Sequence, residues 1–296
     1  MTGRKTAADF HPAILEIFDG YVHGKLSKRE FIERAAKYAA AGVTGAMIFN
    51  QLRPDYALAQ QVKPDDPAIR TERPSVPSPK GHGAISGLLV MPAKAKGKLP
   101  AVLVIHENRG LNPYIEDVAR RLAKAGYLAF APDALTSVGG YPGNDDKGRE
   151  LQAKLDPRKL FEDWVASFDY LRLHAKSTGK VGAVGFCYGG GICNALAVAC
   201  PELAASVPYY GRQPTAAEVP SIKAPLLIHY AENDERINAG ALPYQAALLT
   251  HQKPFDVHYY PGTQHGFHND TTPRYDKAAA ELSWSRTMAF FGKHLR

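Results

Sequence analysis

Apolar and polar positions follow two different patterns along the chain, and the pattern changes near residue 84. Before that point, apolar side chains recur every three to four residues, a spacing typical of amphipathic helices. It predicts helices over residues 11–24, 27–42 and 55–62. The stretch from 63 to 83 is rich in proline and charge, which indicates a linker or an extended arm.

From residue 84 onward, short apolar runs bounded by Gly and Pro alternate with longer amphipathic segments. Strands that are apolar on both faces and separated by helices are typical of a mostly parallel sheet flanked by helices. We expect strands at 84–92, 99–107, 127–133, 180–186, 204–211, 224–234 and 255–262, and helices at 114–126, 158–175, 188–200, 240–251 and 274–295. The chain is therefore predicted to have three parts: a helical N-terminal extension (1–72), a linker or extended arm (73–83) and an α/β catalytic domain (84–296).

Composition narrows the class of protein. The 296 residues are 45% hydrophobic and 22% charged, which is enough apolar material for a sizeable core. The formal net charge is +7, but the basic residues are dispersed and only residues 94–98 form a dense run, so we expect no nucleic-acid partner. No apolar run reaches the 18 residues of a membrane span, and we expect no membrane partner.

The number and spacing of the cysteines indicate the redox compartment of the protein and bear on whether it has a zinc site. Cys187, Cys193 and Cys200 lie in one segment, and their odd number gives no disulfide framework. Their spacing is not that of a zinc site, so no metal is expected. Free cysteines in a chain of this length favour a reducing compartment, and we predict a cytoplasmic location.

The segment 26–49 has a competing interpretation. Lys28 and Arg29, followed by a mild apolar stretch, resemble a degenerate twin-arginine export signal, which would place the protein in the periplasm. The alternative is a folded helix, because Ser27 and Glu30 have the spacing of a capping box and Gly42 stands where a glycine ends a helix. We favour the helix.

Ligands of parallel sheets bind beyond the carboxyl ends of the strands, so the residues there are candidates for chemistry. The stretch Gly-Phe-Cys-Tyr-Gly at 185–189 has the form Gly-x-nucleophile-x-Gly, with Cys187 in the usual position of serine. The helix N-terminus that follows such a turn stabilises a thiolate and a developing oxyanion. The glycine spacing does not fit a dinucleotide-binding loop. A tightly packed glycine turn with a structural cysteine remains open at this stage.

A nucleophile requires a base and a group that orients the base. In hydrolases with this turn, the acid and then the histidine follow the nucleophile in the chain. Asp234 follows one predicted strand and His265 follows the next, which matches that order. Glu232 is the rival of Asp234, and His268 on the same loop is the rival of His265; we prefer Asp234 and His265.

Four strand-end motifs together resemble those of the dienelactone hydrolases, cysteine-dependent members of the α/β-hydrolase fold. They are HENRGL (106–111), GFCYGGG (185–191), AENDE (231–235) and YPGTQHGFHND (260–270). The resemblance covers residues from about 84 to 296, and the helical extension is similar to that of a bacterial branch of the family.

The resemblance implies a role for each matching residue. Cys187 corresponds to the nucleophile, His265 to the base and Asp234 to the acid of the triad. Glu107 corresponds to a glutamate that contacts the resting cysteine and helps to form the thiolate. The oxyanion hole would consist of two backbone N–H groups, those of Tyr188 and Asn108.

The chain differs from the family at a position that binds the carboxylate of the substrate. Well-studied members bind that group with arginines, one of them four residues after the catalytic histidine, where this chain has Asn269. Candidate substrate contacts are Arg109, Arg236, Arg274 and His268.

The expected function is hydrolysis of a small lactone or ester through a thioester intermediate, without a cofactor. A general carboxylesterase or thioesterase is one alternative, and a non-catalytic small-molecule-binding or redox-responsive hydrolase fold is another. The glycine-rich stretch 139–151 is expected to form a lid. Three roles stay open for the extension: packing on the catalytic domain, covering a sheet edge or forming a homodimer.

Overall fold

The N-terminal part of the protein is a small helical unit with its own core. The computed structural model describes residues 5–40 and 42–296. The unit contains α1 (Pro12–Val22), α2 (Lys28–Ala35) and α3 (Gly45–Leu52), together with the 3-10 turns η1 (Ala7–Asp9), η2 (Ala36–Tyr38) and η3 (Tyr56–Leu58). The apolar faces of the helices bury one aromatic-rich cluster that includes Phe18, Tyr21, Phe31 and Phe49. We refer to residues 5–58 as the extension.

Local signals place α2 as the sequence predicts, but its end differs. Ser27 and Glu30 form the expected reciprocal capping box. The helix then tightens into η2 and ends at Tyr38, because Ala39 is already extended, so Gly42 lies beyond the helix end rather than at it. Residue 41 of the predicted helix lies outside the described residues.

The predicted helix at 55–62 is only the short turn η3. Tertiary hydrogen bonds explain the difference: the backbone N–H of Asp55 donates to the carbonyl of Thr271, and that of Val62 donates to the carboxylate of Asp117. The N–H of Val62 is thereby diverted from the i−4 carbonyl that it would bond in a helix.

The sheet contains nine strands and is mostly parallel, as predicted. Its order is β1-β3-β5-β4-β6-β7-β8-β9, and β2 pairs only with β3. The strands from β5 to β9 in this order run parallel, and β3 is antiparallel to β5. The main strands are β3 (Gly83–Pro92), β4 (Leu99–Ile105), β5 (Leu128–Pro132), β6 (Ser177–Phe186), β7 (Ala205–Tyr209), β8 (Leu226–Asn233) and β9 (Phe255–Gln264).

The predicted boundary between extension and catalytic domain is corrected by two short strands. β1 (Ile69–Glu72) lies inside the range predicted as helical, and β2 (Ser75–Ser78) lies inside the range predicted as linker or extended arm. Both pair antiparallel with β3. Four-residue strands carry too little periodicity to be recognised, and it is the pairing with β3 that orders them.

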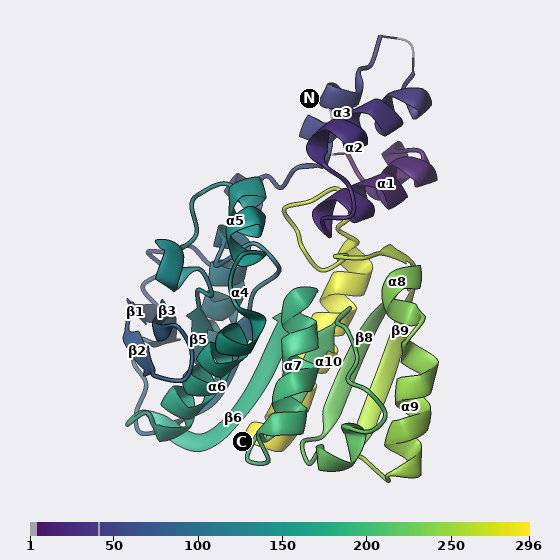
Figure 1. The fold of residues 1–296 in the computed structure, drawn as a ribbon. Coiled ribbons are helices and arrows are strands. Elements are labelled where there is room, and N and C mark those ends of the chain that lie inside the picture. Colours follow the sequence, from purple (N-terminus) through teal and green to yellow (C-terminus); the bar gives the residue numbers. More distant parts are fainter. Residues whose placement is uncertain (1–4, 41) are drawn as a thin grey trace.

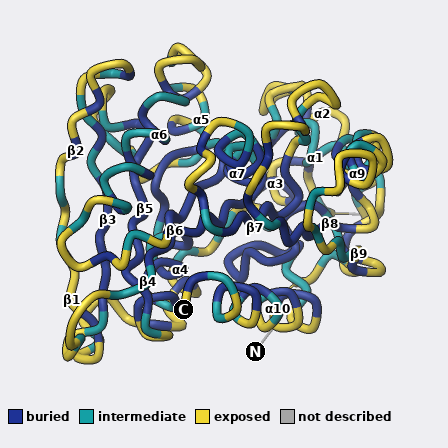
Figure 2. The backbone as a smooth tube through the Cα atoms, turned by 90° about the horizontal axis from the view of Figure 1, so that it is seen from below, coloured by how far each residue is buried: buried dark blue, intermediate teal, exposed yellow. Residues whose placement is uncertain are grey.

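Helices cover both faces of the sheet. α4 (Pro113–Lys124) and α10 (Lys277–Leu295) pack on one face, and α6 (Pro157–Leu173), α7 (Tyr188–Ala199) and α9 (Ala241–Thr250) on the other. Figure 2 shows the strands as a buried layer between these two rows of helices. Across the described part of the chain, no helix combines the length and the apolar character that crossing a membrane requires.

The extension lies over the carboxyl edge of the sheet, with α1 nearest to it (Figure 1). Its contacts with the catalytic domain are specific. The side chain of Asn108, just after β4, donates to the carbonyl of Val22 at 2.9 Å. Tyr21 donates to Asp146, and Tyr56 donates to Asp145 at 2.9 Å, both in α5 (Asp145–Gln152). The extension thus covers the edge where the sequence places the site.

Candidate active site

Cys187 stands on a sharp turn between β6 and α7. Its φ of 58° and ψ of −114° are unusual for a residue other than glycine, and it is the N-cap of α7. A Cβ atom at Gly185 would lie 2.2 Å from the carbonyl oxygen of Gly189, and one at Gly189 would lie 2.3 Å from that of Ile105. Only glycine fits these two positions, so the backbone can approach closely enough to hold the cysteine in its strained conformation.

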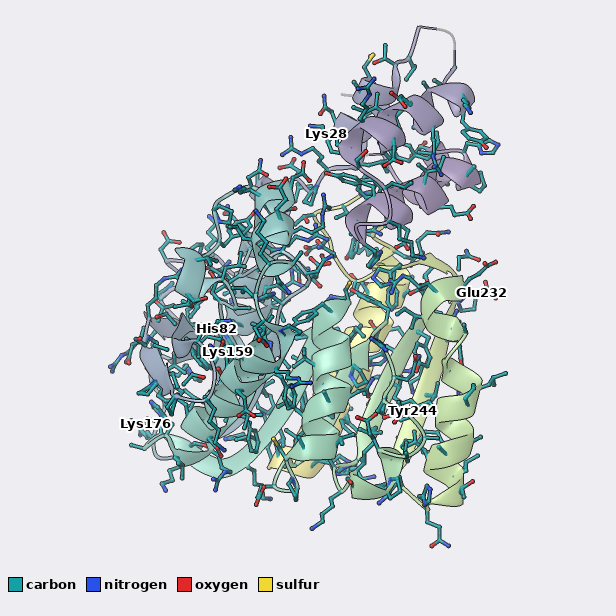
Figure 3. All side chains as sticks on the ribbon, in the orientation of Figure 1. Lys28, His82, Lys159, Lys176, Glu232 and Tyr244 are labelled. Carbon is teal, nitrogen blue, oxygen red and sulfur yellow. The ribbon has the colours of Figure 1, made fainter. Side chains whose placement is uncertain are left out.

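His265 and Asp234 form a buried pair beside the cysteine. The Nδ1 atom of His265 lies 2.5 Å from Oδ2 of Asp234, which caps the four-residue helix α8 (Glu235–Asn238). Both side chains are almost fully buried. The rival Glu232 is exposed near α8 (Figure 3) and accepts from the backbone N–H of Gly262 instead. The structure therefore pairs His265 with Asp234.

A second histidine, His23, reaches the sulfur of Cys187 from the extension. Its Nε2 atom lies 3.4 Å from Sγ, and its ring contacts that of His265 with centroids 4.8 Å apart. Nε2 of His265 has no hydrogen-bond partner among residues 5–40 and 42–296. Sequence reasoning missed His23, and the only signal in the chain was Asp19 four residues earlier, on the same helical face.

Charge around the sulfur favours a thiolate. Burial raises the pKa of Cys187, but the charges of His265 and His23 outweigh burial and lower it to about 5. Burial lowers the pKa of His265, yet Asp234 and Cys187 outweigh that effect and raise it to about 10. The two groups titrate as one coupled pair, whose stable form is thiolate with imidazolium. Burial raises the pKa of the other two thiols, that of Cys200 to about 11 and that of Cys193 further.

Glu107 does not make the contact that the resemblance implied. Its Oε2 atom accepts a 3.3 Å hydrogen bond from Nδ2 of Asn269 and lies 3.7 Å from Nε of Arg109. His23 is instead the group that donates to or accepts from the sulfur. Asn269 also accepts from the backbone and hydroxyl of Thr271, so it orders the loop after β9 rather than facing a ligand.

The backbone around the turn is compatible with the expected oxyanion hole. Tyr188 is the first residue of α7, where backbone N–H groups have no intrahelical acceptor. Ile105 at the end of β4 is the strand partner of Gly185, which brings the segment containing Asn108 alongside the turn. The pairing of the Tyr188 and Asn108 N–H groups around one oxygen stays a prediction.

The three candidate arginines differ in how far their N–H groups are already paired within the protein. Arg109 is buried and paired with Asp145 at 3.1 Å, so it anchors α5 instead of facing a ligand. Nη2 of Arg236 donates to Nε2 of His23 at 2.8 Å, while its Nε is buried without a hydrogen bond. Arg274 is likewise buried, with Nε and Nη1 lacking hydrogen bonds. Between these two arginines lies Asp19, 3.6 Å from Arg236 and 3.8 Å from Arg274.

His268 is packed in the core, and its role as a substrate contact stays a prediction. Its Nδ1 atom lies 2.6 Å from the hydroxyl of Tyr114, and its ring packs on Phe186 with centroids 5.1 Å apart. Burial lowers its pKa well below the usual value, which keeps the ring neutral. The same loop directs His265 toward Asp234 and His268 toward Tyr114.

The stretch 139–151 is not a loop alone. Its first part is a glycine-rich turn, with positive φ at Gly139, Gly140 and Gly143, and its second part begins α5. Arg149 of α5 lies over the ring of Tyr21 at 4.3 Å. The segment therefore supports the extension, and it is the extension that lies against Cys187.

His23, Cys187 and His265 also form a group of possible metal ligands. One atom from each lies within 4.8 Å of the others. Histidine nitrogen and cysteine sulfur are ligands that zinc takes in proteins. The expectation of a metal-free site remains a prediction.

Known proteins are similar to this chain in sequence and in fold. Residues 85–295 match the sequence model of the dienelactone hydrolase family, and residues 1–38 match a model described as YqhI-like. A putative hydrolase fragment, YghX, of Escherichia coli K12 is 66% identical over 39% of this chain and 98% of its own length. A probable 2-oxo-3-(5-oxofuran-2-ylidene)propanoate lactonase of a Bradyrhizobium species is 33% identical over 67% of this chain and 86% of its own.

A solved structure agrees with these relatives. The putative dienelactone hydrolase of Klebsiella pneumoniae superimposes with a TM-score of 0.69 and 27% identity, covering 77% of this chain and all of that one. Because the family match spans more than half of the chain and the sheet has the same architecture, the protein belongs to the dienelactone hydrolase family, as a hydrolase with the α/β-hydrolase fold and a helical N-terminal extension.

Proposed function

We propose that the protein hydrolyses a small ester or lactone, with Cys187 as the nucleophile and a thioester as the intermediate. One observation carries the proposal: a cysteine in a strained turn at a helix N-terminus lies beside a buried His265–Asp234 pair. The cysteine pKa of about 5 supports it, because the thiolate is the nucleophile. The name of the Bradyrhizobium relative, a probable lactonase, also favours ring-opening of a lactone.

The acylation step uses groups already in place. In the resting ion pair the thiol proton is already on Nε2 of His265, whose Nδ1 is held by Asp234. The thiolate attacks the carbonyl carbon and forms a C–S bond, while backbone N–H groups stabilise the oxyanion. Collapse of the adduct breaks the C–O bond, and the leaving oxygen takes the proton from His265. In a lactone the leaving oxygen stays attached to the acyl chain.

Deacylation returns the site to its starting state. His265 takes a proton from water, the resulting hydroxide adds to the thioester carbonyl, and the C–S bond breaks to release the carboxylic acid. A thiolate is a better leaving group than an amide nitrogen. Esters and lactones therefore fit the site better than peptides.

Arg236 and Arg274 are the proposed contacts of a substrate carboxylate. Both carry buried N–H groups that face Asp19 at 3.6 and 3.8 Å but make no hydrogen bond, so these groups retain the capacity to donate to a ligand. Arg236 also borders a cavity of about 440 Å³ lined by Gln213 and Tyr244 among others. The lining of this cavity includes neither Cys187 nor His265, and Cys187 itself is only 7% exposed.

The test compares wild type, Cys187→Ala and the matched control Cys200→Ala on p-nitrophenyl acetate and on a dienelactone. The proposal expects Cys187→Ala to lose turnover of both substrates and Cys200→Ala to retain it. Equal turnover by wild type and Cys187→Ala would contradict the cysteine mechanism. Turnover of the simple ester alone would favour the alternative, a general carboxylesterase or thioesterase, and no turnover of either by wild type would favour a binding protein.

A further inference from the structure

The extension places a second Asp–His pair on the nucleophile. We propose that His23, oriented by Asp19, is a catalytic residue that stabilises the Cys187 thiolate, so that the active site is complete only with the extension docked. This inference rests on the proposed function, since it assigns His23 a role at the same sulfur.

The geometry of the second pair repeats that of the first. Nδ1 of His23 lies 3.1 Å from Oδ1 of Asp19 and 2.8 Å from its backbone carbonyl, which fixes Nδ1 as the donor. Nε2 then faces Sγ of Cys187 at 3.4 Å. In the first pair, Nδ1 of His265 likewise meets the carboxylate of Asp234. The sulfur therefore has an Asp-oriented imidazole on the extension as well as one on the catalytic domain.

The turn that carries His23 is held by a contact with the catalytic domain. His23 is the C-cap of α1, and Gly24 follows with a φ of 75° that lets the chain reverse there. The carbonyl of Val22 accepts the hydrogen bond from Asn108, the residue proposed for the oxyanion hole. These contacts hold the His23 ring over the sulfur, with 12% of its side chain exposed.

The pKa shifts of Asp19 and His23 also fit this arrangement. Burial raises the pKa of Asp19, but hydrogen bonding by His23 and the charge of His265 outweigh it and hold the pKa well below the usual value. Burial lowers the pKa of His23, yet Cys187 and Asp19 outweigh it and raise the pKa. The raised pKa of His23 and the lowered pKa of Asp19 both favour the charged forms that match a thiolate. Nη2 of Arg236 also lies 2.8 Å from Nε2 of His23, so the proposal requires Arg236 to leave this atom for the ring to donate to the sulfur.

A role for His23 is also consistent with the contacts that Glu107 makes. The acidic group expected at the resting cysteine binds Asn269 and Arg109 instead. The side chain that lies 3.4 Å from the sulfur is His23, from another part of the chain. A cation stabilises the thiolate where a carboxylate opposes it.

The experiment measures the ionisation of the Cys187 thiol directly. The rate at which iodoacetamide alkylates Cys187 is measured against pH by mass spectrometry in wild type, His23→Ala, His23→Gln and Asp19→Asn, with EDTA present. His11→Asn is the matched control, because His11 lies in the same extension, is exposed and caps α1 in a way that Asn can replace. Esterase kcat/KM and thermal unfolding are recorded for each variant.

We expect both His23 variants to shift the alkylation midpoint upward by about one to three pH units, as loss of a neighbouring opposite charge does. Asp19→Asn should shift it less, in the same direction, and His11→Asn should leave it unchanged. Unshifted midpoints in folded His23 variants would overturn the inference, while an inactive Cys187→Ala would still support the proposed function. An active Cys187→Ala would overturn both. If His23→Ala fails to fold, His23→Gln and Asp19→Asn decide the question on their own.

Discussion

The two Asp–His pairs at Cys187 lie in regions built on different principles. Asp234 and His265 follow adjacent parallel strands, so the sheet itself brings them together, and both are at most 4% exposed. Asp19 and His23 lie four residues apart on one helix, and 26% of the Asp19 side chain is exposed. The first pair is fixed by the core of the catalytic domain, whereas the second reaches the sulfur only because the extension docks. This difference predicts unequal consequences when each pair is altered.

The largest effect is expected from removing the histidine of the first pair. His265→Ala should lower kcat/KM by about 10²–10⁴-fold, because it removes the general acid and base of both half-reactions. His23→Ala should lower kcat/KM by a smaller factor, since His265 still moves the protons. Ester hydrolysis measured for the two variants side by side checks the order. A greater loss in His23→Ala would reverse the assignment of the two rings.

The carboxylates should follow the same order with smaller effects. Asp234→Asn leaves His265 without the partner that orients it, and we expect about a 10²-fold loss in kcat. Asp19→Asn should cost about tenfold or less, because the backbone carbonyl of Asp19 still accepts from His23. Steady-state kinetics under the same conditions measures both. Equal losses would mean that the two pairs are equivalent.

The pH profile sharpens the comparison for the first pair. The pKa of Cys187 is lowered to about 5, so the thiolate is lost as pH falls through that value. The pKa of His265 is raised to about 10, so the imidazolium is lost as pH rises through that value. We therefore expect kcat/KM to be bell-shaped, with a plateau between these limits. A lower limb near the ordinary thiol pKa would contradict a preformed ion pair.

The last comparison concerns the stability of two turns, the one that presents Cys187 and the one that presents His23. Gly189→Ala brings a methyl group within 2.3 Å of the Ile105 carbonyl, so we expect a stability loss of about 2 kcal/mol or more and loss of activity. Gly24→Ala has no atom within 4 Å and pays only for its φ of 75°, about 1 kcal/mol. Urea unfolding gives both values. Similar losses would show that the turn beside His23 is packed as tightly as the one at Cys187.

Sequence reasoning succeeded where a local pattern and the sheet rule coincide. Strand–helix alternation predicted the mostly parallel sheet, and the Gly-x-Cys-x-Gly motif predicted the turn at Cys187. The order along the chain pointed to Asp234 and His265, because the carboxyl ends of parallel strands share one edge. Sequence reasoning did not foresee that His268, on the same loop as His265, packs against Tyr114 in the core.

The sequence by itself determined the main strands and helices of the catalytic domain, the turn at the nucleophile and the pair on the following strands, because these depend on short-range periodicity and on a general rule of sheet topology. Only the tertiary structure decided which side chains surround the sulfur. His23 is 164 residues from Cys187 along the chain, and no local pattern encodes a contact between separate folding units. The same docking gives Asp19 its position between Arg236 and Arg274. Those contacts arise from the fit of α1 against the carboxyl edge, a surface that exists only once both parts have folded.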